Sequence, residues 1–394
     1  MKKGSLRGAK PLSIKTSPFP LRGRGTQGAR VTKMSKKAIL VLADGSVYHG
    51  YAFGAEADTY GEVVFNTSMT GYQEMLTDPS YAGQIVVPTY PLIGNYGVNE
   101  QDVESSRIQV RGFIVREECL EPSHYLNQKT IHEYLAESGI PGIWGLDTRA
   151  ITRKLRSFGV MMGYMTTEKT PQEALAELKK APDYGSMDFV REVSCTVPYQ
   201  WPSGGADPVF NVVVLDCGLK FNILRLLTKR GCRVTAVPCT ASAKEILAMN
   251  PDGIVLSPGP GDPELLDYIV KEIKKLIGKK PIMGICLGNQ LIGRAFGART
   301  FKLKFGHRGG NHPVRELATG RIHITAQNHG YAVDPDTVRD GLEVSHINLN
   351  DGTVEGLRHK ELPIFCIQYH GEASPGPLDN TYLFDQFIEM MKVK

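Results

Sequence analysis

The 394-residue sequence lacks a Cys-x-x-Cys pair, and none of its apolar runs approaches the ~20 residues that a membrane-spanning helix needs. Its seven cysteines are widely separated and odd in number, a pattern that argues against a disulfide framework and against a zinc site. We therefore expect free cysteines in a reducing compartment, and no contact with a membrane.

Acidic residues are absent from the first 37 positions, which carry eleven lysines and arginines. The remaining residues, 38–394, hold 35 basic and 41 acidic side chains, a net charge of −6, although the whole chain is formally at +5. A mildly acidic body has no basic surface of the kind that nucleic-acid binding requires, so no nucleic-acid partner is expected. The length allows two domains, each with its own core.

The basic N-terminal segment, residues 1–33, has no apolar core region and is therefore not a secretory signal. Two interpretations remain. Met34 precedes the first predicted strand and looks like a natural start, which would make residues 1–33 upstream sequence. The segment is also poor in acids and contains arginine, as organellar transit peptides do. We favour the first interpretation, treat residues 1–33 as a basic disordered extension, and expect a cytoplasmic protein, with organellar import as the alternative.

Strand and turn signals dominate the region up to about residue 185. The apolar run at 38–43 ends at Asp44-Gly45, a hairpin signal, and helical patterns occur near 130–138 and 148–158. A Pro/Gly/Ser-rich stretch at 194–208 has the composition of a linker. The predicted organisation is a basic extension (1–33), an N-terminal domain (34–190), a linker (191–208) and a C-terminal domain (209–394).

Beyond the linker, strands and helices alternate. Apolar runs predict strands at 210–216, 233–238 and 252–257, and 3.6-residue periodicity predicts helices at 222–231, 243–250 and 267–277. This alternation is typical of βαβ units with a parallel sheet. The predicted fold class is α/β: a C-terminal domain with a mostly parallel sheet flanked by helices, after a mixed, strand-rich N-terminal domain. In such sheets the functional site lies at the carboxyl ends of the strands.

Cys286 stands at one such strand end, in the stretch GICLG (284–288). Pro281-Ile282-Met283 reads as a buried strand, and an amphipathic helix is expected to begin at Gln290. Glycines two residues either side of the cysteine permit the sharp bend of a nucleophile elbow, and a helix N-terminus stabilises a thiolate. A packed, unreactive cysteine is the alternative. The position at a carboxyl end favours the catalytic interpretation.

A cysteine nucleophile needs a base and a group that orients the base. His370 and Glu372 follow a predicted strand at 364–369, and side chains two residues apart in an extended segment point to the same side. The stretch SPGPGDP (257–263) follows another strand and exposes backbone amides in a glycine-rich turn, as an oxyanion hole requires. A plain surface turn is the alternative for this stretch.

Four stretches in this order resemble the class I (triad) glutamine amidotransferase domain: SPGPGDP (257–263), GICLGNQ (284–290), AQNHGYAV (326–333) and QYHGEASPGP (368–377). Residues 61–99 and 145–159 closely resemble the small-subunit family of carbamoyl phosphate synthetases. The resemblance covers nearly all of the chain from Met34. It implies hydrolysis of L-glutamine to glutamate and ammonia, and passage of the ammonia to a large subunit that makes carbamoyl phosphate from bicarbonate and ATP. The chain itself is then expected to hold no cofactor and no metal, since ATP and magnesium serve the large subunit.

The resemblance also assigns roles to residues. Cys286 corresponds to the nucleophile, His370 to the general base and acid, and Glu372 to its orienter. The amides of Gly259 and Leu287 correspond to the oxyanion hole. The positions that correspond to glutamine binding are Ser80, Gly259, Gly261, Leu287, Gln290, Asn328, Gly330 and Tyr331. Ser80 is contributed by the N-terminal domain.

Three positions depart from the family pattern. Asn289, Gly371 and Pro258 stand where the family usually has His, Pro and Asn. None of the changes removes a catalytic atom. Glycine at 371 frees the backbone between base and orienter, and is expected to loosen the contact between them.

Competing interpretations make different demands on the sequence. An amidotransferase subunit for anthranilate, guanylate or cytidylate synthesis would lack the 61–99 block. A free-standing cysteine amidase would not need the N-terminal domain. A catalytically idle regulatory subunit of the same complex would be signalled by loss of Cys286, His370 or Glu372, and all three are present. The sequence does not decide between arginine and pyrimidine biosynthesis as the pathway served.

Overall fold

The computed structural model describes residues 36–202 and 207–392, and the predictions about residues 1–33 lie outside this range. In these two ranges, no helix has both the length and the apolar composition to span a bilayer.

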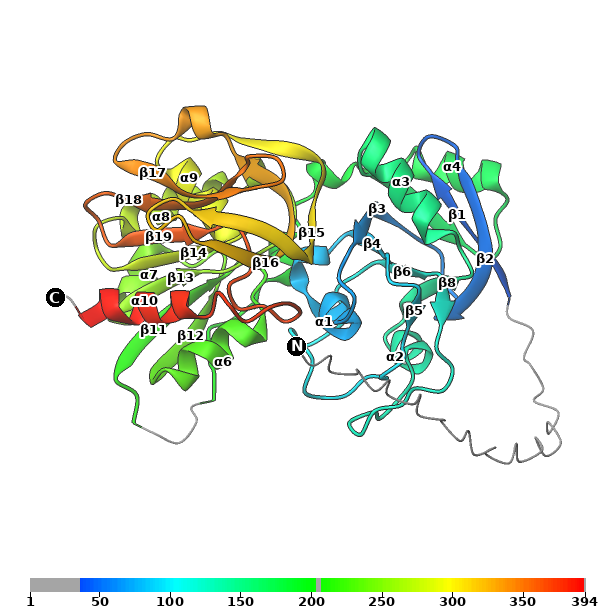
Figure 1. Ribbon diagram of the computed structural model, residues 1–394, viewed down its shortest axis with the longest axis horizontal. Coiled ribbons are helices and arrows are strands. Elements are labelled where there is room, and N and C mark those ends of the chain that lie inside the picture. Colours follow the sequence, from blue (N-terminus) through cyan, green and yellow to red (C-terminus); the bar gives the residue numbers. More distant parts are fainter. Residues whose placement is uncertain (1–35, 203–206, 393–394) are drawn as a thin grey trace, which may run out of the picture. The chain divides into compact units, whose positions relative to one another are not determined.

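The first half of the described chain is built on a closed sheet in the order β1-β2-β8-β6-β4-β3-β9, with β9 pairing again with β1 (Figure 1). The predicted hairpin is confirmed, since β1 and β2 pair antiparallel around Asp44-Gly45. The strands are β1 (Lys37–Leu42), β2 (Val47–Gly54), β3 (Thr59–Asn66), β4 (Gln84–Pro88), β6 (Gly112–Val115), β8 (Pro141–Trp144) and β9 (Met161–Thr166), and β5 (Leu92–Ile93) pairs with β7 (Glu117–Glu118) in a separate small sheet.

Two helices of this half lie where the sequence patterns predict them, and further helices occur at positions that the patterns do not mark. The patterns near 130–138 and 148–158 correspond to α2 and α3, whose first turns are capped by Thr130 and Asp147. The helices are α1 (Tyr72–Thr77), α2 (Ile131–Glu137), α3 (Thr148–Phe158), α4 (Pro171–Leu178) and α5 (Val190–Val193), with 3-10 turns η1 (Pro79–Tyr81) and η2 (Tyr184–Ser186).

The second half contains a ten-stranded sheet in the order β10-β12-β11-β13-β14-β19-β18-β17-β15-β16. Its strands are β10 (Tyr199–Gln200), β11 (Phe210–Asp216), β12 (Cys232–Pro238), β13 (Gly253–Leu256), β14 (Ile282–Ile285), β15 (Thr300–Glu316), β16 (Ile322–Val333), β17 (Leu342–Asn348), β18 (Val354–His359) and β19 (Ile364–Ile367). Strands β12, β11, β13, β14 and β19 are parallel, which confirms the predicted α/β class.

The other strands of this sheet run antiparallel, so the parallel pairing is confined to its middle. The reason is connectivity. Beyond α9 (Leu287–Ala295), the strands from β15 to β19 follow one another without an intervening α-helix. Short connections of this kind favour antiparallel pairing, and all of them except the one from β16 to β17 join neighbouring antiparallel strands. The remaining elements are α6 (Phe221–Lys229), α7 (Ala243–Ala248), α8 (Asp267–Leu276), α10 (Tyr382–Lys392), η3 (Pro263–Leu265) and η4 (Pro335–Thr337).

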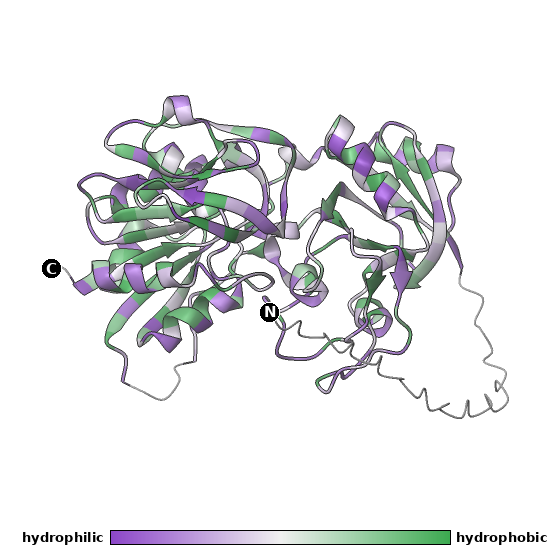
Figure 2. Cartoon of the chain, viewed as in Figure 1, coloured by the Kyte–Doolittle hydropathy of each residue, from purple (hydrophilic) through white to green (hydrophobic). Residues whose placement is uncertain are grey.

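Helices cover both faces of the parallel strands because alternate residues of each strand point to opposite faces. On β11, Val213 and Leu215 pack with residues of α7, α8 and α9, whereas Val212 and Val214 pack with residues of α6 and α10. Figure 2 shows the corresponding concentration of hydrophobic residues on the central strands, with hydrophilic residues on the outer sides of the helices. The two cores hold the strand ends, and therefore the loops that follow them, in a fixed order.

The turn from β14 to α9 differs from the expectation in one respect. The helix begins at Leu287, three residues before the predicted start, and is almost wholly buried rather than amphipathic. It packs against β13, β14, β16 and β19 of the sheet and against α8, so both of its sides face protein. Its early start places Cys286 at the N-cap, with φ 53° and ψ −103°. The left-handed φ is strained for a residue with a side chain, as a nucleophile elbow requires.

Glycine is required at both ends of this turn. A Cβ on Gly288 would lie 2.3 Å from the carbonyl oxygen of Leu256, and a Cβ on Gly284 would lie 2.8 Å from the carbonyl carbon of Gly288. These contacts involve backbone atoms, which have little freedom to move. The Gly-x-Cys-x-Gly spacing therefore reflects close packing of the turn against β13 and against itself.

We expect Gly288→Ala to lower the free energy of unfolding by about 1–3 kcal/mol, because the added methyl group overpacks the turn. Gly293→Ala is the matched control on the same helix, since its Cβ would meet only side-chain atoms, the nearest at 3.2 Å. Helix propensity should offset that contact and keep the control within about 1 kcal/mol of the parent. Equilibrium urea unfolding measures both. Equal effects would show that the approach to β13 is not a constraint.

Candidate active site

Cys286 lies at the carboxyl end of β14 with 1% of its surface exposed. Its Sγ is 3.7 Å from the carbonyl oxygen of Asn328 and 3.6 Å from the side-chain nitrogen of Gln368. Asn289 donates to the side-chain oxygen of Gln368, so this departure from the family pattern is part of the packing around the sulfur. The thiol is thus held in one place at the end of the parallel strands.

His370 and Glu372 follow β19, the strand next to β14, and the expected contact between them is confirmed. The distance from His370 Nδ1 to Glu372 Oε1 is 2.6 Å, and both side chains are buried. The contact forms with Gly371 between the two residues, so glycine there does not prevent it. Nδ1 is engaged by the carboxylate, and Nε2 has no hydrogen-bond partner among the described residues. The Cys286 thiol lies close enough to the imidazole to contribute to its raised pKa.

Lys220 completes this group, and the sequence analysis missed it. Its Nζ lies 3.1 Å from Glu372 Oε1 and donates to the carbonyl oxygen of Ala373 at 2.6 Å. Lys220 is buried immediately before α6. A signal was present in the sequence, since this lysine follows the end of a predicted parallel strand, where polar residues gather at a site.

The charges of this group reinforce one another. Burial alone would raise the pKa of Glu372, but the neighbouring charges of Lys220 and His370 lower it to about 2. Burial alone would lower the pKa of His370, but the Glu372 carboxylate raises it. Near neutral pH the pair is therefore a carboxylate and an imidazolium. An imidazolium beside a cysteine sulfur stabilises the thiolate, which is the nucleophilic form.

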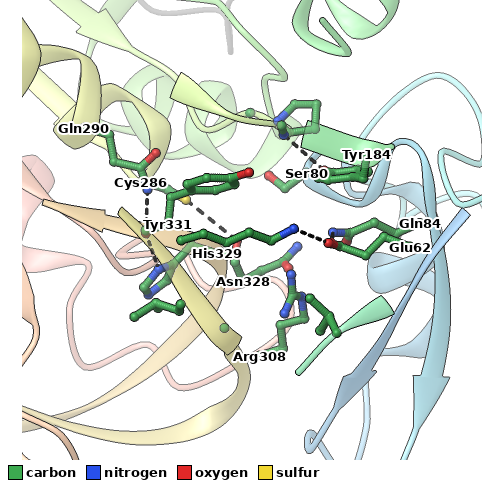
Figure 3. A pocket seen from close by; sticks show the side chains of 18 residues that line it. Glu62, Ser80, Gln84, Tyr184, Cys286, Gln290, Arg308, Asn328, His329 and Tyr331 are labelled. Atoms are coloured by element: carbon green, nitrogen blue, oxygen red, sulfur yellow. Dashed lines mark hydrogen bonds and ion pairs between the residues drawn. The ribbon is translucent and has the colours of Figure 1, made fainter. Parts of the chain in front are cut away.

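A pocket opens in front of Cys286 and is lined by both halves of the chain (Figure 3). Seven of the eight positions predicted for glutamine line it; only Leu287 does not. They are Ser80, Gly259, Gly261, Gln290, Asn328, Gly330 and Tyr331. His370 is absent from this lining and instead borders a smaller neighbouring cavity together with Asp78, Lys220 and Asn328.

Ser80 reaches the pocket from η1 in the first half of the chain, and Asp78 fixes its position. One Asp78 carboxylate oxygen accepts from the amide of Ser80 at 2.9 Å, and the other accepts from the side-chain amide of Asn328 at 2.9 Å. The buried Ser80 hydroxyl has no partner among the described residues and faces the pocket (Figure 3). An unpartnered buried hydroxyl is costly, which points to a polar ligand.

The remaining predicted residues are fixed by hydrogen bonds or by tight backbone packing. Gln290 donates to the carbonyl oxygen of Tyr331 at 2.8 Å, which ties α9 to β16. The Gly261 amide donates to the hydroxyl of Tyr184. A Cβ on Gly259 would lie 2.2 Å from a backbone oxygen, so only glycine fits there. The Leu287 amide is the first of α9 and therefore has no partner within the helix.

Further pocket residues were not predicted because they come from distant strands. Lys302 on β15 forms an ion pair of 2.7 Å with the buried Glu62 on β3. Gln84 donates to the same carboxylate, and Figure 3 shows Glu62 and Gln84 side by side. These residues give the pocket charged groups of both signs opposite Cys286. No local pattern marks them, since their proximity depends on how the two halves of the chain pack.

One group in the described residues has the composition of a metal site: His307, His329 and Glu355 lie within 4.8 Å of one another by their ligand atoms. Both nitrogens of each histidine already face oxygen acceptors, among them Asp351 at 2.8 Å from His307. Burial lowers the pKa of His307, but Asp351 and Glu355 raise it to about 9. The ring is therefore protonated on both nitrogens near neutral pH. We read the group as a hydrogen-bonded cluster contributed by β15, β16 and β18. The expectation that the chain holds no metal or cofactor stays a prediction.

The ionised state of Glu372 predicts a pH dependence of stability. Its pKa is about 4.5 when unperturbed and about 2 in the folded chain, so its charge stabilises the fold above that ordinary value and the stabilisation is lost as the pH falls. We expect parent protein to be more stable than Glu372→Gln at pH 7, and the difference in unfolding free energy to narrow between about pH 5 and pH 3. Glu389→Gln, at an exposed position, is the control and should show no such narrowing. A difference independent of pH would contradict an ionised, paired Glu372.

Comparison with known proteins agrees with this geometry. Residues 40–165 match the family model for the carbamoyl-phosphate synthase small chain, CPSase domain, and residues 213–390 match that for class-I glutamine amidotransferases. The chain is 52% identical over 368 residues to the carbamoyl phosphate synthase small chain of Syntrophotalea carbinolica, covering 90% of this chain and 98% of that one. It is 52% identical over 368 residues to the Aquifex aeolicus protein of that name (91% and 99%) and 54% identical over 360 residues to that of Staphylococcus epidermidis (91% and 97%). With this identity along nearly the whole of each relative, the chain belongs to the carbamoyl phosphate synthase small chain family.

Proposed function

We propose that this chain is the glutamine-hydrolysing subunit of a carbamoyl phosphate synthase, with Cys286 as nucleophile and His370 as general base and acid. The observation that carries the proposal is the arrangement at one sheet edge. A buried thiol in a strained turn borders a pocket, and the imidazole that interacts with it is held by Glu372. Nucleophile, base and orienting group are the three parts that such catalysis needs.

The chemistry follows from these groups. The Cys286 thiolate attacks the carboxamide carbon of glutamine, and the negative charge that develops on the oxygen is met by the amides of Gly259 and Leu287. His370 donates its proton to the departing nitrogen and the C–N bond breaks. Ammonia leaves, and the γ-glutamyl group remains on the Cys286 sulfur as a thioester. His370 then takes a proton from water, which attacks the thioester and releases glutamate. Glu372 keeps the imidazole oriented through both steps.

Glutamine would be held by groups of both halves of the chain. The unpartnered hydroxyl of Ser80 supplies a donor or acceptor at the pocket wall, and Asn328, Gly330 and Tyr331 supply the opposite wall from β16. Gln290 acts by holding β16 in place. In this proposal both halves of the chain contribute to substrate binding.

The released ammonia would pass to a synthetase large subunit, the partner that the small-chain family implies. We infer that the two subunits pair as a heterodimer, alone or within a larger oligomer. ATP and magnesium would act in the large subunit, and this chain would need no cofactor of its own. All seven cysteines are free, which supports a reducing location such as the cytoplasm.

A catalytically idle regulatory subunit is the alternative. Cys286, His370 and Glu372 are present, and the described structure brings them together, so no observation favours this alternative.

We expect Cys286→Ser to lower glutamine-dependent carbamoyl phosphate synthesis by several orders of magnitude, because a hydroxyl is a far weaker nucleophile than a thiolate. Synthesis from added ammonium should persist in the reconstituted complex, since that route bypasses the thioester. Cys119→Ser, in the N-terminal half, should retain both activities. Loss of both activities in Cys286→Ser would assign the residue to structure, and retention of glutamine use would remove it from the mechanism.

Asp78→Ala should weaken glutamine binding more than it slows turnover. The substitution removes the acceptor of both the Ser80 amide and the Asn328 side chain, so we expect KM for glutamine to rise about tenfold and kcat to fall less. Asp334→Ala removes a similar turn cap on η4, at a residue that does not line the pocket, and should leave both constants unchanged. Steady-state glutaminase assays decide this. A fall in kcat with KM unchanged would show that Asp78 does not organise substrate binding.

A further inference from the structure

The buried carboxylate of Glu104, in the loop between β5 and β6, contacts α6 of the other half of the chain. One of its oxygens accepts from Arg225 at 2.9 Å, and the other accepts from the backbone amide of Asn222 at 3.0 Å. The backbone carbonyl oxygen of Glu104 accepts from the amide of Phe221 at 2.8 Å. A single residue of the N-terminal half thus accepts hydrogen bonds from three residues of α6.

These contacts replace a helix cap. The first amides of a helix have no partner within it, and a side chain at the N-cap usually accepts from them. The N-cap of α6 is Lys220, and its side chain makes no capping hydrogen bond. A lysine has no acceptor to offer. Glu104 supplies the acceptors for the Phe221 and Asn222 amides instead, and its negative charge suits the positive end of the helix dipole.

The residues at this helix start are the ones that hold Glu372. Lys220 places its ammonium group 3.1 Å from the Glu372 carboxylate. Asn222 donates from its side chain to the backbone carbonyl oxygen of Glu372 at 2.5 Å. The Glu372 carboxylate in turn accepts a hydrogen bond from Nδ1 of His370. Any shift of the first turn of α6 therefore moves both the ammonium group that pairs with the Glu372 carboxylate and the side chain that holds the Glu372 backbone.

We propose that Glu104 is a positioning residue for the glutaminase reaction: it caps α6 from the N-terminal half and so holds Lys220 and Asn222 against Glu372. The inference rests on the proposed function. It gives the N-terminal half a second role, since that half then sets the orientation of the general base as well as lining the pocket.

The test is Glu104→Gln in the full chain. The amide keeps the shape of the side chain but lacks the charge, and its nitrogen cannot accept a hydrogen bond. We expect kcat for release of glutamate from L-glutamine to fall at least about tenfold, as small misplacements of catalytic groups do, with KM for glutamine within about twofold. The alkaline limb of kcat, which follows loss of the His370 proton, should move to lower pH as Glu372 withdraws; Lys220 and Cys286 are the other groups that face this imidazole.

Asp385→Asn is the matched control. Asp385 pairs with Arg230 just after the last turn of α6, at 2.7 Å, so this variant loosens the same helix at the opposite end from Lys220. It should lower the thermal midpoint without changing kcat or the alkaline limb. The inference is overturned if Glu104→Gln retains the parental kcat and pH profile, or if Asp385→Asn reproduces its kinetic effect.

A second variant tests the same inference in case Glu104→Gln does not fold. Arg225→Gln removes the cation that fixes the Glu104 carboxylate, and Arg225 is only partly buried. It should show the same fall in kcat and the same shift of the alkaline limb, to a smaller degree; parental kinetics would overturn the inference. The proposed function fails separately, if the parent protein itself does not release glutamate from glutamine or if Cys286→Ser does so at the parental rate.

Discussion

The buried ion pair between Lys220 and Glu372 is the interaction on which the geometry of the site depends. Both side chains are almost fully removed from water, and a buried charge is tolerated only beside a partner. Lys220 follows β11, Glu372 follows β19, and the strands between them are β13 and β14. The pair therefore fixes two loops at the same edge of the sheet, on either side of the turn that carries Cys286. Removal of Lys220 would leave the Glu372 carboxylate with His370 as its remaining ion-pair partner among the described residues, and removal of Glu372 would take this anion away from both Lys220 and His370.

The electrostatic consequence reaches the sulfur through one further residue. A fixed carboxylate keeps the imidazole of His370 protonated and orients its free nitrogen away from Glu372. The strained backbone of Cys286 brings the thiol to that imidazole. Charge, hydrogen bonding and backbone strain thus act on the same few atoms, which is the arrangement expected where pKa values are adjusted for catalysis.

The two halves of the described chain are connected through buried polar contacts at this site. Asp78 joins Ser80 to Asn328, and Glu104 joins the loop before β6 to the start of α6. Buried polar groups of this kind are stable only when each is satisfied, so they permit one relative placement of the residues that they connect. A pocket built in this way needs both halves for its shape. The N-terminal half is therefore part of the site, in addition to any role in assembly.

The sequence alone determined the catalytic candidates and the positions along the chain of the strands that carry them. Cys286, His370 and Glu372 could be found because each lies next to a strong strand pattern. The contact between His370 and Glu372 forms in a turn, in which the Ala373 amide donates to the His370 carbonyl oxygen, and not in the extended segment that the sequence suggests. Turn glycines and alternating apolar runs are local features, and local sterics decide them. The start of α9 was placed three residues late, since its burial on both sides removed the periodic signal. The antiparallel extension from β15 to β18 was also not foreseen.

Only the tertiary structure decided which groups support these candidates. Lys220 reaches Glu372 over 152 positions of sequence, Lys302 reaches Glu62 over 240, and Asn328 reaches Asp78 over 250. A lysine before a helix or an acidic residue in a loop has the same local pattern whether it is solvated or buried beside a partner. The difference comes from desolvation, which acts only once distant segments have packed together and excluded water.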